Sequence, residues 1–504
     1  MDAIYLMNSL WTMVAAILVI FMIGGFVMLE AGSTRMKNAG HIAGKTIFTF
    51  GLASLVFWAA GYAFIFGDNG NFFVGMTGFF YGGDLVEGDG LAKTVFFVFQ
   101  TAFAGIAVTI ALGGFAERAK FPVYVIFTIL FGLIVYPVVA HWIWGGGWLS
   151  GHGKQDFAGS TVVHLTGAMG ALAATILLKP RIGKFNRDGS VNNIAGHNQV
   201  YTALGVFILW VGWFGFNAGS TVSVEGASFG FIALNTNLAA AAGAVAATFI
   251  SWLMLGKSDI PTILNGALAG LVAITASCAF VDPWASVVIG LVAGVLVYFS
   301  MKMFEKLKVD DPIFALSVHG AAGAVAATII SWLLLGKSDI PTILNGALAG
   351  LVAITASCAF VNPWASVVIG LIAGVLVYFS MKLFEKLKVD DPIYALSVHG
   401  AAGIWGTLST GFFATPELAE QVGGRAGLFY GGGFEQLGVQ TMGVVTSGIF
   451  AFVVSFIILY VIKLVLGGLR VSEEEEIMGL DMSEHGSYGY PEQMEAEKSM
   501  KQSS

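Results

Sequence analysis

The sequence predicts an all-α protein that crosses a lipid bilayer many times. Of its 504 residues, 57% are hydrophobic and only 11% are charged, and the mean hydropathy is +0.81. Apolar stretches of the roughly 20 residues needed to cross about 30 Å of hydrocarbon recur along the whole chain. Because these stretches are long and do not alternate between apolar and polar residues, we expect helices and not barrel strands.

Fourteen candidate transmembrane helices follow one another along the chain. Gly, Ala and Ser recur within them, which suits helices that pack closely in lipid, because small side chains let the backbones approach. The candidate helices cover residues 9–29, 44–66, 94–115, 121–143, 158–178, 200–216, 230–255, 261–281, 284–304, 312–335, 341–361, 364–384, 392–413 and 440–467.

A tandem duplication accounts for three of these helices. Residues 241–320 recur immediately as residues 321–400, and 74 of the 80 positions are identical. Repeats that stack into solenoids usually run about 20 to 50 residues and diverge, so we interpret this pair as a recent duplication inside an older protein. When one copy is removed, eleven helices remain.

Basic residues predict how the helices are oriented. Arg35 and Lys37, then Arg118 and Lys120, then the stretch 179–187 all follow odd-numbered helices, whereas the alternate loops are acidic. Because positive charges are enriched on the cytoplasmic side, we expect the N-terminus outside. The first helix lacks a basic leader and a small-residue cleavage site, so we predict a retained helix and not a signal peptide.

Two intramembrane histidines indicate a functional site. His164 lies eight residues after Asp156, and both His319 and its copy His399 follow an aspartate at the same spacing. At 1.5 Å per residue, each imidazole should lie about 12 Å along its helix, near the bilayer midplane. The two helices enter from opposite faces, so the histidines should meet. This is the pattern of an inverted repeat with a site between its halves.

A purely structural role is the alternative for such a histidine. One interhelical hydrogen bond would suffice to explain it. Ionisable residues within membranes are more often functional, however, and the matched spacing in both halves favours a function. The other histidines lie near helix ends, in loops or in the tail, and we interpret them as interfacial: His41, His141, His152, His197 and His485.

Aromatic residues gather near the outer ends of several predicted helices. Most Phe and Trp residues in membranes face lipid or the interface. Trp144 and Ser220 both lie at outer helix ends, and for them a cation cage is the alternative. A ring face attracts a small cation by about 0.5 to 2 kcal/mol, and a hydroxyl adds a lone pair.

Several long motifs, in order along the chain, resemble the ammonium transporter family (Amt, Mep and Rh proteins). The resemblance covers the whole chain apart from the extra 80 residues. The motifs are Trp144-Gly-Gly-Gly147, Asp156-Phe-Ala-Gly-Ser-Thr-Val-Val-His164, Gly212-Trp-Phe-Gly-Phe-Asn-Ala-Gly-Ser220, Val309-Asp-Asp-Pro312 with Val318-His-Gly320, and Gly479-Leu-Asp-Met-Ser-Glu-His-Gly486.

The resemblance implies an ammonium-transporter fold and a role for each matching residue. The fold is eleven transmembrane helices as two inverted five-helix repeats plus a C-terminal helix, in a homotrimer with one pore per subunit. Trp144, Phe103 and Ser220 would recruit ammonium, and Phe103 would form a ring gate with Phe216. Trp213 would line the lumen.

The resemblance also implies a pore site, a location and a regulatory partner. His164 and a second-half histidine, His319 or His399, would form a twin-histidine pair, and Asp156 would support the outer site structurally. The protein would reside in the inner cell membrane with a cytoplasmic C-terminus. The tail after Gly479 resembles the segment on which PII-type regulatory proteins dock.

The expected organisation has four parts. Residues 1–180 form the first inverted half, with helices one to five. Residues 195–415 form the second half, which contains both tandem copies. Residues 434–470 form the last transmembrane helix, and residues 471–504 form the cytoplasmic tail.

The duplication creates a conflict in topology, because three extra crossings would invert everything downstream. In one alternative, a hybrid helix at 312–335 completes the pore through His319, and the residues after about 340 are surplus. In the other, the hybrid segment does not span as an ordinary helix, and His399 completes the pore. We favour the second, because only the second copy continues into Ile404-Trp405-Gly406 and the last helix.

Other functions remain open at this point. The duplication could leave a folded but inactive or altered pore. A non-conducting ammonium sensor usually carries a long signalling domain, whereas the tail here has only about 35 residues. We do not expect an enzyme or a cofactor, because the sequence shows no nucleophile and base pair, metal cluster or phosphate loop. The net charge of −7 gives no reason to expect nucleic acid as a partner.

Overall fold

The computed structural model confirms the predicted helical class for the residues that it describes. These are residues 3–82, 90–156, 159–183, 194, 196–225, 228–255, 363–390, 396–421 and 424–490, together with positions 283, 287, 291, 349, 352, 353, 357 and 361. Across these ranges the only extended pairings are two isolated β-bridges, Ala119 with Arg470 and Val361 with Ala414.

The first half contains five of the predicted spans, several of them interrupted by π-helical turns. Lys93–Gly113 is one unbroken helix, whereas Phe121–Ile143 changes to a π turn midway and resumes at Tyr136, with a proline in the first turn of both α-helical parts. Pro122 lies in the first turn after the extended Lys120, where its missing N–H has no helical partner. The elements are α1 (Ala3–Ser33), α2 (Ala39–Val56), η2 (Phe57–Gly61), α3 (Tyr62–Phe66), α4 (Lys93–Gly113), α5 (Phe121–Leu130), η3 (Phe131–Val135), α6 (Tyr136–Ile143), α7 (Trp148–Gly151), η4 (Ser160–Leu165) and α8 (Thr166–Leu178).

The second half follows the predicted spans equally closely where it is described. Its elements are α9 (Gln199–Asn217), η5 (Ala218–Thr221), α10 (Ser228–Leu255), α16 (Pro363–Lys386), η7 (Leu396–Ala401) and α17 (Ala402–Phe413). α18 (Pro416–Gln421) and α19 (Glu435–Val465) follow it. The predicted helices at 261–281, 284–304, 312–335 and 341–361 lie outside the described residues, apart from isolated positions.

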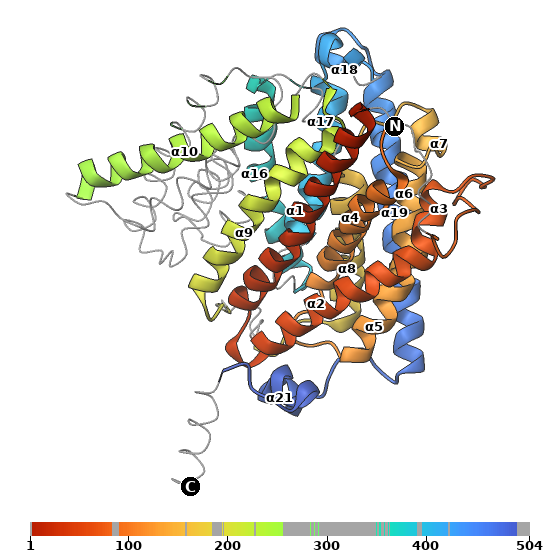
Figure 1. The fold of residues 1–504 in the computed structure, drawn as a ribbon. Coiled ribbons are helices and arrows are strands. Elements are labelled where there is room, and N and C mark those ends of the chain that lie inside the picture. Colours follow the sequence, from red (N-terminus) through yellow and green to blue (C-terminus); the bar gives the residue numbers. More distant parts are fainter. Residues whose placement is uncertain are drawn as a thin grey trace.

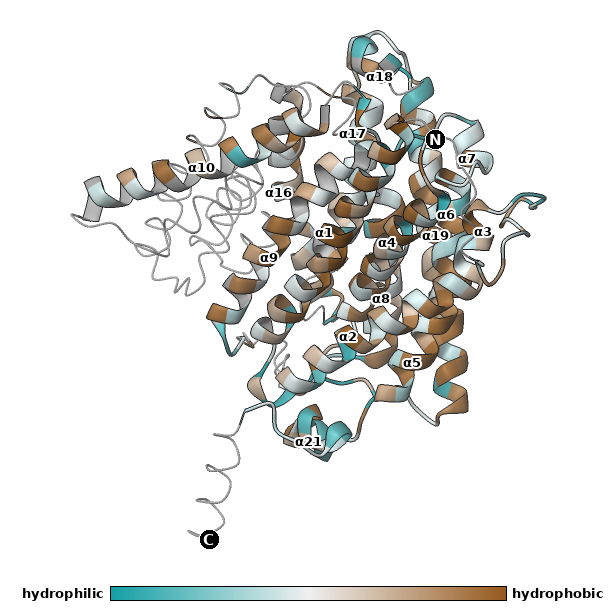
Figure 2. Cartoon of the chain, in the orientation of Figure 1, coloured by the Kyte–Doolittle hydropathy of each residue, from teal (hydrophilic) through white to brown (hydrophobic). Residues whose placement is uncertain are grey.

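Six helical segments of the described chain are long and apolar enough to cross a membrane: Ala3–Gly32, Met36–Phe66, Lys93–Gly113, Phe121–Gly151, Thr161–Leu178 and Glu435–Val465. Apolar residues run along the helices of the bundle, and polar residues concentrate near its two ends (Figure 2). Side chains such as Leu10 and Phe21 on α1 and Ile449 on α19 stay exposed. A bilayer would cover such a surface, which supports a multi-pass membrane protein.

The helices pack as a bundle in which the central members come from both halves. α1 lies along α9, α4 lies against α8, and α19 contacts both α8 and α17. The shared core includes Ala107, Phe131 and Val163, all fully or almost fully buried. Figure 1 shows α10 leaving this bundle at an angle.

The second repeat copy supplies most of the duplicated region that the structure describes. α16 and all of η7 except its last residue belong to residues 321–400. The buried face of α16, with Ala365 and Ile369, packs with Ala402 and Phe413 of α17. Position His319 of the first copy lies outside the described residues.

The tail folds back onto one end of the bundle. α20 (Glu473–Met478) begins with a capping box between Ser472 and Glu475, and α21 (Leu480–His485) follows it. The Asp481 carboxylate accepts hydrogen bonds from the backbone N–H groups of Gly40 and His41 at 3.1 and 2.7 Å. His41 is fully buried, and its Nδ1 lies 2.9 Å from His485 Nε2.

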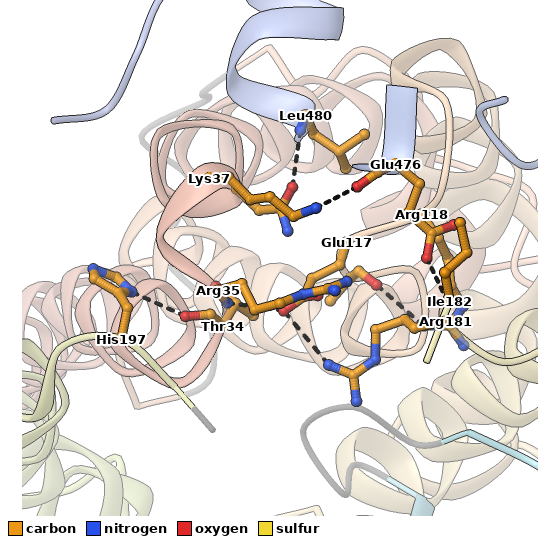
Figure 3. Close-up of polar contacts among 12 residues, drawn as sticks. Thr34, Arg35, Lys37, Glu117, Arg118, Arg181, Ile182, His197, Glu476 and Leu480 are labelled. Carbon is orange, nitrogen blue, oxygen red and sulfur yellow. Dashed lines mark hydrogen bonds and ion pairs between the residues drawn. The ribbon is translucent and has the colours of Figure 1, made fainter. Parts of the chain in front are cut away.

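Buried ion pairs fasten the helix ends beside the tail. Glu117 is fully buried between Arg35 and Arg181, as Figure 3 shows. Arg181 also pairs with the fully buried Asp390 of the second copy, with Nε 3.0 Å from Oδ2. Arg470 pairs with the buried Glu476 of α20. The arginines that follow the first, third and fifth spans therefore gather at the same end as the tail.

Candidate functional site

Two histidines from opposite halves meet inside the bundle. His164 Nδ1 lies 3.1 Å from His399 Nδ1, and the two rings are nearly parallel, with centroids 5.1 Å apart and an interplanar angle of 14°. Each residue is only 8% exposed. Because a neutral imidazole carries one N–H, one ring donates this hydrogen bond and the other accepts it.

Each of these histidines lies in a π-helical turn at the start of its helix. His164 belongs to η4 and His399 belongs to η7. Single π turns within α-helices are rare and often mark functional sites. Two further buried hydroxyls join the same region, because Thr161 Oγ1 of η4 lies 2.6 Å from Thr407 Oγ1 of α17.

Asp156 holds the start of the His164 helix from outside it. Its Oδ1 accepts from the backbone N–H of Gly159 at 3.1 Å, and its Oδ2 accepts from those of Thr161 and Val162 at 2.8 and 3.0 Å. A carboxylate is favoured here because the N–H groups at a helix start lack intrahelical partners. The helical turns begin at Ser160, so only the last part of the segment from Asp156 to His164 is helical.

Aromatic side chains and Asp156 meet at this helix start. Trp144 Nε1 donates to the backbone oxygen of Asp156 at 2.7 Å. Phe103 meets Trp144 edge to face, with centroids 5.8 Å apart and an angle of 88°, and Phe99 packs against Phe103 at 4.9 Å. The structure therefore brings Trp144, Phe103 and Asp156 together.

The side chains of three predicted site residues, Trp213, Phe216 and Ser220, lie outside the described part of the chain. Their backbone belongs to α9 and η5. A Cβ atom built on Gly219 would lie 3.8 Å from Phe99 Cε2, so η5 passes beside the aromatic group. The roles of these three residues stay predictions.

Sequence reasoning missed several buried polar groups near the site. The Gln100 side chain, between Phe99 and Phe103 in sequence, is 8% exposed, and its Oε1 has no partner among the described residues. Tyr136 is 1% exposed, and its hydroxyl is likewise unpaired in that part of the chain. A polar residue inside an apolar span was the signal available, but it does not say which helix face the residue occupies.

Comparisons with known proteins agree with the geometry. The model of the ammonium transporter family matches residues 10–327 and 320–490. Ammonium transporter Amt2 of Archaeoglobus fulgidus is 37% identical over 494 residues, which cover 96% of this chain and 88% of that protein. Among solved structures, a sensor Amt protein matches with a TM-score of 0.72 at 33% identity, covering 95% of this chain and 98% of the other. Mep2 of Candida albicans matches with a TM-score of 0.67 at 25% identity, covering 96% and 91%. This chain belongs to the ammonium transporter family.

Proposed function

We propose that this protein carries ammonium across the membrane by recruiting the cation at the outer aromatic site, removing its proton and passing ammonia along His164 and His399. The observation that carries the proposal is the buried contact between these two imidazoles, at 3.1 Å. It joins one residue from each proposed inverted half. Family membership and the relatives named as ammonium transporters support the same substrate.

The charge of ammonium explains why the proton must leave. An unpaired ion in an apolar lumen loses its water shell and pays several kcal/mol in desolvation free energy, more than one aromatic contact returns. Neutral ammonia avoids that penalty and needs only hydrogen-bonding groups along its way. Potassium has no proton to give up, so the same barrier excludes it.

The histidine pair offers such groups through its two Nε2 atoms. The ring that donates from Nδ1 keeps a bare Nε2, which accepts a hydrogen bond. The ring that accepts at Nδ1 carries its proton on Nε2, which donates. Ammonia both donates and accepts hydrogen bonds, so this polarity suits it. An imidazole nitrogen can also accept a proton, so the pair provides a place for the released proton.

The outer site presents ring surfaces to the cation. The Trp144 N–H is committed to the Asp156 carbonyl at 2.7 Å, so the indole π face is the part of Trp144 left for a cation. In this proposal the Ser220 hydroxyl adds a lone pair. Phe103 and Phe216 form the gate and Trp213 lines the lumen below it. Asp156 fixes the site through its carbonyl and its helix cap.

The proposed architecture is an eleven-helix protomer with about three extra helices from the duplication. Residues 1–180 and 195–415 are its inverted halves, 434–470 its last helix and 471–504 its tail. The gathering of Arg35, Arg181 and Arg470 beside the tail supports a cytoplasmic tail and an external N-terminus, by the positive-inside bias. We also propose an inner-membrane location, a homotrimer and a tail that binds a PII-type regulatory protein.

A non-conducting ammonium sensor is the second candidate. One observation favours it: the sensor Amt protein matches 95% of this chain at 33% identity. If the duplication disturbs conduction, the protein would instead contain an altered or inactive pore. A non-conducting sensor and an inactive pore both predict no ammonium-evoked current.

The test is a current measurement on purified protein in proteoliposomes on a solid-supported membrane. Pulses of ammonium should evoke a current or an equivalent uptake of ammonia, and equal pulses of potassium should not. Replacing His164 with Ala should abolish ammonium uptake or its selectivity over potassium. Unchanged currents and potassium exclusion in that variant would remove the histidine pair from the mechanism, and silent wild-type protein that binds ammonium would favour the sensor.

A further inference from the structure

Two buried glutamines of α19 form hydrogen bonds with the backbone of the loop that leads to the outer aromatic site. Gln436 and Gln440 are four residues apart, hence on one helix face, and both are fully buried. Gln440 Oε1 accepts from the backbone N–H of Gln155 at 3.2 Å, and its Nε2 donates to the backbone oxygen of the same residue at 2.9 Å. Gln436 Nε2 donates to the oxygen of Gly153 at 3.2 Å.

A buried lysine adds another hydrogen bond to this loop. Lys154 is 6% exposed, and its Nζ donates to the Gln155 oxygen at 3.1 Å, so that one carbonyl accepts from both Lys154 and Gln440. The lysine stem fills a notch in α19 at Gly443, where an added Cβ would lie 2.5 Å from Lys154 Cε. The loop is therefore fixed to α19 by side-chain hydrogen bonds and by shape.

This loop continues directly into the residue that orients the outer site. Asp156 follows Gln155 in the chain, and its backbone oxygen accepts the Trp144 indole N–H at 2.7 Å. Its carboxylate caps η4, which carries His164. A displacement of Gln155 therefore moves the acceptor that sets the tilt of the Trp144 ring.

We infer that Gln440, assisted by Gln436, is a positioning residue for the outer cation site, acting through the Gln155 backbone, Asp156 and the Trp144 ring. This inference rests on the proposed function of that site. α19 lies outside both proposed inverted halves, so the helix that carries the tail also sets the geometry of the outer mouth. Neither glutamine touches the cation.

The hydrogen bonds of Gln440 determine which variant is informative. Gln440→Leu keeps the volume but leaves the buried Gln155 N–H without its acceptor, while the Gln155 oxygen keeps Lys154. Unpaired buried donors are costly, so the loop should leave its site-competent position part of the time. If only a fraction of the molecules is in the site-competent state, the apparent affinity for ammonium falls in proportion to that fraction. The later transport steps stay unchanged.

The experiment measures KM and maximal current for ammonium in wild-type protein, Gln440→Leu and Gln436→Leu. We expect KM to rise about tenfold in Gln440→Leu and about threefold in Gln436→Leu, which loses one hydrogen bond, with maximal currents within about twofold of wild type. Thr441→Val is the matched control. It loses one hydrogen bond on the same turn, but the side chain is exposed and bonds only within α19, to Leu437, so KM should not change.

A double-mutant cycle with Trp144→Phe separates positioning from general loosening. Phe cannot donate a hydrogen bond to the Asp156 carbonyl. In the Trp144→Phe background, adding Gln440→Leu should therefore raise KM by less than about threefold relative to Trp144→Phe alone. Fully multiplicative effects, or an unchanged KM in Gln440→Leu, overturn the inference. A lower maximal current with unchanged KM also overturns it.

A binding readout keeps this test distinct from the test of conduction. Ammonium chloride should raise the thermal midpoint of wild-type protein more than potassium chloride does, because a ligand of the folded state stabilises it. Gln440→Leu should need about tenfold more ammonium for the same rise. Wild-type protein that binds but does not conduct refutes the transport proposal alone. Wild-type protein that shows neither effect refutes both.

Discussion

Replacement of Asp390 by Asn tests which repeat copy is built into the bundle. Asp390 belongs to the second copy and is fully buried. Its carboxylate accepts from Arg181 N and Nε at 2.8 and 3.0 Å, and its backbone oxygen accepts from Arg118 Nη2 at 2.9 Å. Asp310 occupies the same position in the first copy, so Asp310→Asn is a matched control with the same chemistry.

The magnitude follows from the surroundings of the carboxylate. Burial by itself would raise the pKa of Asp390, but the charges of Arg181 and Arg118 and the hydrogen bonds from Arg181 outweigh burial and lower the pKa from 3.8 to about 2. That lowering corresponds to about 2 kcal/mol of folding free energy. Breaking a buried pair also leaves charge uncompensated, at about 3 to 5 kcal/mol. We expect Asp390→Asn to lower the free energy of unfolding by about 3 kcal/mol.

The pH dependence has a definite sign. Because folding lowers the pKa, the contribution of Asp390 is fully present above the ordinary value of 3.8 and is lost as the pH falls through about 2. The difference in stability between wild-type protein and Asp390→Asn should therefore be constant from pH 5 upward and shrink below about pH 4.

The assay is thermal unfolding of the detergent-solubilised protein, followed by tryptophan fluorescence at several pH values. The thermal midpoint of Asp390→Asn should lie several degrees below that of wild type at pH 7, whereas the midpoint of Asp310→Asn should equal that of wild type. Equal losses in the two variants, or a larger loss in Asp310→Asn, would refute the assignment of the second copy to the bundle.

Two other substitutions test the outer site and its support. Gly159 has φ +104°, and a Cβ there would lie 2.7 Å from Val163 Cγ2 and 3.2 Å from Trp144 Cη2; Gly159→Ala should therefore raise the KM for ammonium and lower the thermal midpoint, and a variant with wild-type values would contradict this geometry. Burial lowers the pKa of Lys154 to about 8 against the opposing charge of Asp156. Because protonated Lys154 is disfavoured in the folded state, Lys154→Met should be more stable than wild type at pH 7, with the advantage shrinking from pH 8 to 10 in thermal melts. An advantage that grows with pH would refute the burial argument.

The positions of the helices could be predicted from the sequence because length and apolarity alone define a membrane span. Expected and observed limits agree to within a few residues for Phe121–Ile143 and for α16. The meeting of His164 with a second-half histidine also followed from spacing and direction. The π turns did not, because the choice between a π and an α turn depends on packing across helices and not on local residue type.

Other features depend on contacts between distant parts of the chain. The sequence places Gln440 inside an apolar helix but says nothing about the Gln155 backbone, 285 residues away. The sequence places His41 near a helix start, but it does not show that the folded tail brings His485 against it. The two copies differ at only six positions, so residue identity could not decide which of them supplies the partner of His164.

The most direct measurement of the central claim compares His399→Ala with His319→Ala in ammonium-evoked currents on a solid-supported membrane. Both variants remove one imidazole from the same sequence context, but the structure places His399 against His164. We predict that His399→Ala loses ammonium uptake or its selectivity over potassium, while His319→Ala retains wild-type currents. Loss of conduction in His319→Ala with wild-type behaviour in His399→Ala would contradict the account.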